Sequence, residues 1–214
     1  PEEDEKWHDY WVNHSLDWYL KLGLSKDRLR IREHDQTELA HYSKATHDIE
    51  YQFPWGWGEI AGIANRTNYD LIAHSKQSGK ELSYFDATTQ QHIIPYVIEP
   101  SFGLDRVIMA LLIEAYSEEM LINKKGKQET RTSLKLSPLV APVQVAILPL
   151  SKKEVLSELA REIYKDLKSS ALIKPLVYYD ETQSIGRRYR RQDEIGTPLC
   201  ITVDFESLDD KAVT

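Results

Sequence analysis

The sequence has few of the residues that form disulfides and metal centres. Among its 214 residues there is one cysteine, Cys200. This excludes an internal disulfide and a cysteine-rich metal site, and it fits a reducing, cytoplasmic setting. The seven histidines are scattered along the chain without an H-x-x-x-H or Cys/His spacing, so the pattern predicts no protein-held metal. Cys200 lies in an apolar stretch and is interpreted as a small core residue.

Long apolar runs and glycine-rich phosphate motifs are also missing. The longest apolar stretches, such as residues 107–113, are too short to cross a bilayer, so no membrane partner is expected. The acidic residues 2–5 are unlike the basic start of a signal peptide. Neither G-x-G-x-x-G nor G-x-x-x-x-G-K-S/T occurs, which argues against a nucleotide-binding α/β enzyme that uses one of these phosphate motifs.

The composition is that of an ordinary globular protein, with 41% hydrophobic and 29% charged residues. The length allows one large domain or two modest ones. The net charge of −7, from 27 basic and 34 acidic residues, argues against indiscriminate polyanion binding. A local basic patch could still bind nucleic acid.

The N-terminal part begins with a predicted amphipathic helix over residues 7–22, followed by Gly23 at the position of a helix C-terminal glycine. Its rings recur at steps of three and four residues. We interpret this aromatic stripe as core packing in preference to a ligand site. The stripe consists of Trp7, Tyr10, Trp11, His14 and Trp18.

Several strands and one strongly apolar helix follow. Alternation and turn residues indicate an antiparallel sheet backed by helices. We expect strands over residues 48–53, 81–86 and 92–98, a short element over residues 59–65 and a buried helix over residues 104–116.

The C-terminal part has a different rhythm. Residues 117–141 are polar, and residues 124–127 are expected to form an exposed loop. Two prolines, Pro138 and Pro142, indicate a boundary near residue 140, which gives domains 1–140 and 141–214. In the second domain a strand–helix–strand–helix–strand order predicts a small α/β fold. Its elements are expected over residues 143–148, 152–168, 176–179, 184–196 and 201–205.

The most informative stretch is Val-Ile-Glu-Pro-Ser-Phe-Gly-Leu-Asp-Arg at residues 97–106. It predicts a strand that meets a glycine and then a helix. An arginine in the first helical turn, Arg106, suits phosphate because its fork donates two parallel hydrogen bonds. Glu99 could accept hydrogen bonds from a ligand ammonium group. An ion pair of Arg106 with Glu99 or Asp105 fits the spacing equally well.

This stretch resembles motif 3 of class II aminoacyl-tRNA synthetases, in the version found in homodimeric glycyl-tRNA synthetases. Other segments resemble the same family in the same order. The resemblance implies a partial α+β antiparallel-sheet class II catalytic core, running from after motif 2 through motif 3, and then a small α/β anticodon-binding domain. The other segments are residues 48–51, 53–60, 62–67 and 69–71 in the glycine-site region and residues 184–189, 191–198 and 202–205 in the anticodon-binding domain.

The resemblance also implies an activity. Such enzymes join glycine to ATP as glycyl-adenylate and transfer the glycine to the 3′ end of glycine tRNA. The carboxylate of glycine is already a nucleophile, so the protein supplies alignment and charge stabilisation. Mg²⁺ is expected with the phosphates of ATP, since a polyphosphate leaving group needs neutralising. The full-length enzyme is expected to be a cytoplasmic homodimer.

The site residues implied by the resemblance fall in two short segments, with Arg106 and Glu99 as the catalytic pair. The rings of Trp55 or Trp57 could supply close walls that exclude a methyl group. The expected ATP-binding residues are Glu59, Ile60, Gly103, Leu104, Asp105 and Arg106. The expected glycine-binding residues are Glu99, Pro100, Ser101, Phe102 and Gly103.

One dense basic cluster lies near the C-terminal end. By charge pattern alone it could be a solvated helix face paired with Asp193 and Glu194. The family resemblance favours contact with tRNA phosphates. The cluster consists of Arg187, Arg188, Arg190 and Arg191.

The sequence departs from the family pattern in two respects. We find no segment of the motif 2 type, which carries the arginine for the α-phosphate, and none of motif 1, which forms the dimer. We therefore expect a portion of a longer enzyme that is inactive by itself. The alternative is a non-catalytic, synthetase-like module that binds tRNA or protein.

Overall fold

The computed structural model describes residues 2–122, 126–170 and 176–214. The chain divides into two compact units, Pro1–Ala110 and Leu111–Thr214. The division lies earlier in the chain than the boundary expected near residue 140, because the residues that lead up to that boundary form a hairpin that packs with the second unit.

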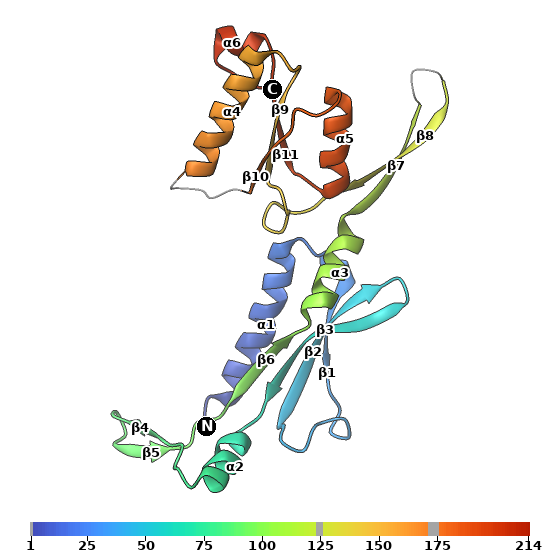
Figure 1. Cartoon of the computed structure of the whole chain (residues 1–214). Coiled ribbons are helices and arrows are strands. Elements are labelled where there is room, and N and C mark those ends of the chain that lie inside the picture. Colours follow the sequence, from blue (N-terminus) through green and yellow to red (C-terminus); the bar gives the residue numbers. More distant parts are fainter. Residues whose placement is uncertain (1, 123–125, 171–175) are drawn as a thin grey trace. The chain divides into compact units, whose positions relative to one another are not determined.

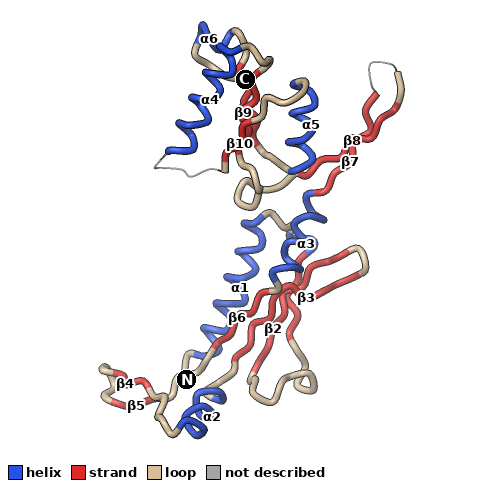
Figure 2. Tube along the Cα trace, in the orientation of Figure 1, coloured by secondary structure: helices blue, strands red, loops and turns tan. Residues whose placement is uncertain are grey.

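The first unit is built on a four-stranded antiparallel sheet with the order β1-β2-β3-β6 (Figure 1). Helix α1 lies along one face of this sheet, and a small β4–β5 hairpin projects from the unit (Figure 2). Its elements are α1 (Asp4–Leu22), η1 (Lys26–Arg28), β1 (Leu29–Glu33), β2 (Ala45–Phe53), β3 (Gly56–Asn65), α2 (Tyr69–Ser78), β4 (Tyr84–Asp86), β5 (Gln91–Ile93), β6 (Ile98–Phe102) and the first part of α3 (Leu104–Ala115).

Helix α1 packs on the sheet with a face other than the predicted one. The face that it buries carries His8, Val12, Ser15 and Tyr19, again at steps of three and four residues. The Tyr19 hydroxyl donates to the carbonyl oxygen of Ile60 at 3.0 Å. These contacts fix α1 on β3, and they leave the aromatic stripe on the other side.

The prediction that the aromatic stripe packs in the core is therefore wrong for this unit. Trp7 and Tyr10 are each 48% exposed, and Trp18 is 42% exposed. Periodicity places the rings on one stripe but does not say which stripe faces the sheet. Here the face that carries His8 and Tyr19 packs on the sheet, because these two side chains reach main-chain carbonyl oxygens of β3.

Two details of the strands differ from expectation. The stretch 92–98 is not one strand, because β5 ends at Ile93 and β6 begins at Ile98, with Pro95 between them. A proline removes a ladder donor and so interrupts pairing. Strand β1 and helix α2 add to the predicted elements.

The second unit contains a parallel three-stranded sheet with the order β10-β9-β11. Its core is formed by Ile147, Ala160 and Val203. The predicted strand–helix–strand–helix–strand order is confirmed, and Gly196 ends its helix in the left-handed conformation at φ +78°. The elements are β7 (Tyr116–Ile122), β8 (Gln128–Leu134), β9 (Val145–Pro149), α4 (Glu154–Ser169), β10 (Val177–Tyr179), α5 (Ile185–Ile195), β11 (Leu199–Val203) and α6 (Glu206–Asp210).

The polar stretch 117–141 is not a simple linker. Most of it forms the antiparallel β7–β8 hairpin, and Arg131 on β8 forms an ion pair with Asp193 on α5. The loop expected over residues 124–127 lies partly outside the described residues.

Candidate functional site

The first unit presents one sheet face that α1 does not cover, and β6 places residues on it by alternation. The ring of Phe102 lies 5.5 Å from that of Trp18 on α1, so Phe102 and Pro100 belong to the helix side. Glu99 and Ser101 therefore lie on the opposite side, which we call the open face. Two of the predicted glycine-binding residues are thus on the open face, and two support it from behind.

Carboxylates from neighbouring strands converge on this open face. Gly62 pairs with Ser101 on one side and with Asp48 on the other. A Cβ atom at Gly62 would come within 3.3 Å of Glu59 Oε1 and 3.6 Å of Asp48 Oδ1. The missing side chain lets both carboxyl groups approach the strand. Asp48 is buried, and its Oδ2 lies 2.6 Å from His34 Nε2.

The residue before α3 bonds to β3 at a point where the pairing of β3 with β2 is interrupted. The β2–β3 register shifts by one residue and leaves Ile60 without a partner in β2. The carbonyl oxygen of Ile60 instead accepts a hydrogen bond from the Gly103 amide at 3.0 Å. The carbonyl oxygen of Glu59 accepts one from Arg106 Nη1 at 2.6 Å. Such bulges often re-aim residues at functional sites.

The structure thus brings together most of the predicted ATP-binding residues. Glu59 and Ile60 contact Gly103 and Arg106 through main-chain atoms. Leu104 is 71% exposed, and Asp105 and Arg106 are also exposed at the first turn of α3. The guanidinium of Arg106 bonds to a carbonyl oxygen, and the carboxylate of Glu99 has another partner.

That partner is Arg66, which the sequence patterns did not single out. Its Nη1 donates to Glu99 Oε2 at 2.8 Å, and two further donors grip Asp70 at 2.6 and 2.9 Å. The guanidinium also stacks 3.9 Å from the centre of the Tyr42 ring. The hydrogen bond from Arg66 lowers the pKa of Asp70, and Asp70 in turn contributes most to raising the pKa of Arg66. The Arg-x-x-x-Asp spacing of Arg66 and Asp70 at the start of α2 was the available signal.

The two tryptophans considered as walls have different positions. The Arg30 guanidinium lies 4.3 Å from the centre of the Trp57 ring and pairs with Glu50 at 2.5 Å. Trp55 is 68% exposed at the β2–β3 turn, where it stacks on Phe53. The Trp57 ring is thus held by Arg30 of β1, which reaches it across β2.

Helix α5 carries the basic cluster, but its four arginines are not equivalent. Arg188 is 1% exposed. It donates to the carbonyl oxygens of Pro149, Glu181, Thr182 and Gln183. Four of its five N–H donors are thus bonded to carbonyl oxygens, and the side chain is closed off from solvent, so a phosphate cannot reach it. Arg188 is therefore a structural residue in this unit.

The other three arginines remain accessible to different degrees. Arg187 is exposed, and its Nη1 donates to Gln183 Oε1 at 3.4 Å. Arg190 pairs with Glu129 at 2.8 Å and Glu194 at 3.2 Å. Arg191 pairs with the buried carboxylate of Asp180. The lowered pKa of Asp180 reflects hydrogen bonds from Arg191 and Thr182 that together outweigh its burial.

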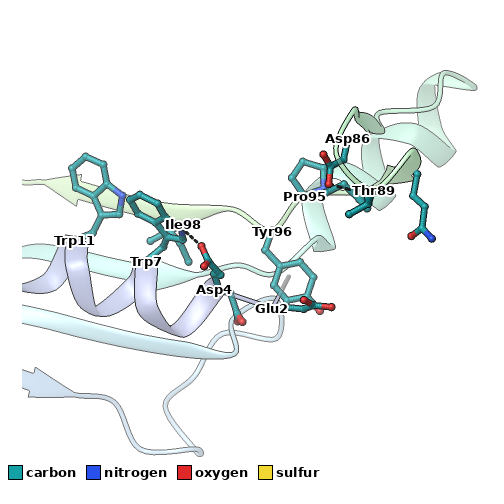
Figure 3. Close-up of a pocket in the computed structure, with 12 residues that line it drawn as sticks. Glu2, Asp4, Trp7, Trp11, Asp86, Thr89, Pro95, Tyr96 and Ile98 are labelled. Carbon is teal, nitrogen blue, oxygen red and sulfur yellow. Dashed lines mark hydrogen bonds between the residues drawn. The ribbon is translucent and has the colours of Figure 1, made fainter.

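A cavity of the first unit lies away from the open face. It measures about 660 Å³ and lies between the start of α1 and the β4–β5 hairpin, with Asp4, Trp7, Trp11 and Tyr96 in its lining (Figure 3). Among residues 2–122, 126–170 and 176–214, no three His, Cys, Asp or Glu side chains are grouped as metal ligands. In the same described part of the chain, no helix is long and apolar enough to span a membrane.

Curated relatives match the chain from end to end. It is 52% identical to the glycine–tRNA ligase of Thermobifida fusca over 217 residues, which cover 100% of this chain and 46% of that protein. It is 53% identical to the glycine–tRNA ligase of Caldanaerobacter subterraneus, covering 100% of this chain and 44% of the relative. Throughout its length the chain is similar to one portion of the glycine–tRNA ligases. It spans less than half the length of these glycine–tRNA ligases, as the missing motifs led us to expect.

Two further comparisons agree with a synthetase fold. Residues 144–214 match a family model described as an anticodon binding domain. The structure resembles that of prolyl-tRNA synthetase from Cryptosporidium parvum complexed with L-proline and AMP, with a TM-score of 0.66 at 18% identity, over 99% of this chain and 42% of that chain. The predicted fold, a partial class II synthetase core followed by an α/β anticodon-binding domain, is confirmed.

Proposed function

We propose that this chain is the part of a glycine–tRNA ligase that carries the glycine pocket, one side of the ATP site and the anticodon-binding domain. The observation that carries the proposal is the open face of the first unit. There Ser101 of β6, Glu59 of β3 and Asp48 of β2 lie beside the bare backbone of Gly62, and Glu99 lies two residues before Ser101 on the same face of β6. The end-to-end similarity to glycine–tRNA ligases supports it.

The chemistry of this face suits glycine. An ammonium group needs carboxylate acceptors, which Glu99 and Glu59 offer. Glycine has no side chain, so a selective site needs walls that collide with a methyl group. In the proposal Ser101 donates to the substrate and Trp57 limits the space. Pro100 and Phe102 fix the position of β6 from the α1 side.

The ATP subsite is proposed at the first turn of α3. Gly103 is held against Ile60, and Arg106 extends beside Glu59, where a guanidinium can grip phosphate or stack on adenine. Mg²⁺ would arrive on the ATP phosphates, and Glu59 and Asp48 present the hard oxygen atoms that it prefers. When bound, the ion would neutralise charge on the leaving pyrophosphate. The prolyl-tRNA synthetase that shares this fold is complexed with ligands of the same two classes, an amino acid and an adenine nucleotide.

For tRNA we propose Arg187, Arg190 and Arg191 on α5, and we omit Arg188 because it is buried. The match to an anticodon binding domain supports this assignment. Glycine tRNA is the proposed second substrate, and a cytoplasmic homodimer is the proposed form of the full-length enzyme.

Leu104 and Asp105 complete the proposed ATP-binding turn.

The test is glycine-dependent ATP–pyrophosphate exchange by the full-length protein that contains this chain. Glu99→Gln is expected to raise the KM for glycine by at least tenfold, because an amide accepts the ammonium group less strongly than a carboxylate. The matched control is Glu158→Gln on the exposed side of α4, which is expected to leave the KM unchanged. Exchange supported only by another amino acid would refute the assignment. Binding of tRNA without any exchange would favour the non-catalytic module instead.

A further inference from the structure

We infer that Asn65 is a positioning residue for the Glu99 carboxylate and that it acts through a left-handed turn at Thr67. The inference rests on the proposed function only for its link to glycine. Its structural part concerns a continuous set of hydrogen bonds at the end of β3.

Asn65 is the last residue of β3 and is 1% exposed. Its side-chain amide is used on both sides. Oδ1 accepts from the Thr67 amide at 3.1 Å, and Nδ2 donates to Asp4 Oδ2 on α1 at 2.7 Å. Lys44 Nζ donates to the same Asp4 oxygen at 2.8 Å. Asn65 therefore ties the first turn of α1 to the turn that follows β3.

Thr67 has an unusual backbone conformation. Its φ is +52°, in the left-handed region that β-branched residues rarely adopt. Such a conformation persists only where the surroundings hold it. The hydrogen bond from the Thr67 amide to Asn65 is the local contact that does so, and Asn65 is itself fixed by Asp4.

The turn is also joined to the strand that carries Glu99. The Val97 amide donates to the Thr67 carbonyl oxygen at 2.8 Å, and the Arg66 amide donates to the Val97 carbonyl oxygen at 2.9 Å. Glu99 is two residues further along. The left-handed conformation of Thr67 thus determines where the backbone of Arg66 lies. It also determines that Arg66 pairs with Val97, in the segment that leads into β6.

The consequence is the orientation of the Glu99 carboxylate. Arg66 occupies Glu99 Oε2 at 2.8 Å, while Asp70 and Tyr42 hold the guanidinium in place. Glu99 Oε1 is then the oxygen that accepts the substrate ammonium group. If the turn relaxes, Arg66 moves away and the Glu99 side chain, which is 49% exposed, loses its fixed rotamer. Binding of the ammonium group should weaken, and binding of ATP should not.

The decisive experiment combines two substitutions in the full-length protein. Asn65→Ala removes the support of the left-handed turn and is expected to raise the KM for glycine about tenfold, with the KM for ATP and kcat within about twofold. Thr67→Gly, added to Asn65→Ala, is expected to bring the KM for glycine back to within about threefold of the wild-type value, because glycine adopts this φ without support. A merely structural role for Asn65 would affect both substrates and would not be rescued at Thr67.

A matched control and a second readout separate the inference from the proposed function. Gln90 also has a positive φ, +56°, in the β4–β5 turn, and Gln90→Gly is expected to change neither KM. Independently of activity, hydrogen exchange at the Val97 amide should become at least tenfold faster in Asn65→Ala and slow again in the double variant. An unchanged KM for glycine with unchanged Val97 exchange, or failure of Thr67→Gly to restore either, would overturn the inference. If the wild-type protein shows no glycine-dependent exchange, the proposed function fails while the amide measurement still decides the role of Asn65.

Discussion

Arg106 Nη1 donates to the main-chain oxygen of Glu59 at 2.6 Å, across the point where β3 loses its register with β2. One donor of the guanidinium is bonded to the backbone, which restricts the positions that the group can adopt. The remaining donors extend from an exposed first turn of α3. The β3 irregularity thus positions Arg106 for a ligand through a main-chain oxygen, and no carboxylate of the described residues is paired with its guanidinium.

Arg106→Ala is expected to lower glycine-dependent ATP–pyrophosphate exchange at least a hundredfold, which corresponds to about 3 kcal/mol of transition-state stabilisation. Stability should change by about 1 kcal/mol or less, because a single exposed hydrogen bond is lost. Exchange kinetics and thermal unfolding measure the two effects. Lys165→Ala, at an exposed lysine of α4, is the control and should change neither. Unaltered exchange in Arg106→Ala would contradict the assigned role.

The sequence alone predicted the local structure correctly where the residue type at a position allows one conformation. Gly23 and Gly196 were expected at helix ends, and both have the positive φ of a C-terminal cap. The stretch that includes Glu99 and Gly103 reads as strand, glycine and helix, and the structure forms β6 and α3 there. These features are local, so the sequence determines them without knowledge of the packing.

The sequence was insufficient where several arrangements satisfy the same pattern. The rings of α1 and the set formed by His8, Val12, Ser15 and Tyr19 both recur at helical steps, and only contacts with the sheet decide which set is buried. The burial of Arg188 likewise depends on the loop at residues 181–183, which supplies its carbonyl acceptors. Arg66 was missed because its role arises from a strand that is distant in sequence.

Arg188→Met should destabilise the second unit by about 2–4 kcal/mol, because buried carbonyl oxygens lose their donors. Urea unfolding followed by circular dichroism measures the effect. The matched control is Arg187→Met, one residue earlier on the exposed side of α5, which should cost less than about 0.5 kcal/mol. Similar stabilities of the two variants would contradict the structural role of Arg188.

For binding of tRNA, Arg187→Met is expected to have a larger effect than Arg188→Met, which is the reverse of their effects on stability. Arg187→Met should weaken binding of glycine tRNA. It should also make the slope of log K against log salt shallower, by the amount that corresponds to the loss of about one phosphate contact. Under conditions in which the Arg188→Met variant is folded, the dependence of its tRNA binding constant on salt should equal that of the wild-type protein. Filter binding at several salt concentrations distinguishes the two, and an unchanged slope in Arg187→Met would remove Arg187 from the proposed tRNA surface.

Gly196→Ala should lower the stability of the second unit for two separable reasons. The residue has φ +78°, and an added Cβ would lie 2.6 Å from Leu136 Cδ1 and 3.1 Å from Leu134 Cβ. Backbone strain costs about 1–2 kcal/mol, and the overlap adds about 1–3 kcal/mol. Gly79→Ala provides the control, because its φ is +69° but nothing lies within 4 Å of the added Cβ. Denaturant unfolding should therefore show the larger loss for Gly196→Ala, and equal losses would argue against the close packing of α5 with the end of β8.

Acid should weaken the first unit through a histidine pair between α1 and the sheet. The rings of His8 and His47 are 5.0 Å apart, and within the described residues Nδ1 of His47 is buried without a hydrogen-bond partner. Burial, and next the proximity of His8, lower the pKa of His47; His34 acts in the same direction, while Glu33 and Asp9 oppose it. The unfolded chain therefore binds the proton more readily. The contribution of His47 to stability is intact above its unfolded pKa of about 6.5 and is lost as the pH falls from there towards its folded pKa.

The expected result is a free energy of unfolding that decreases between about pH 7 and pH 5, with a flatter dependence in His47→Phe, which keeps a ring but cannot take up a proton. Urea unfolding followed by the fluorescence of the tryptophans on α1 reports on this unit. His92→Phe, at an exposed position of β5, is the control and should retain the wild-type slope. If His47→Phe also retains that slope, the protonation that weakens the packing of α1 in acid takes place at another group.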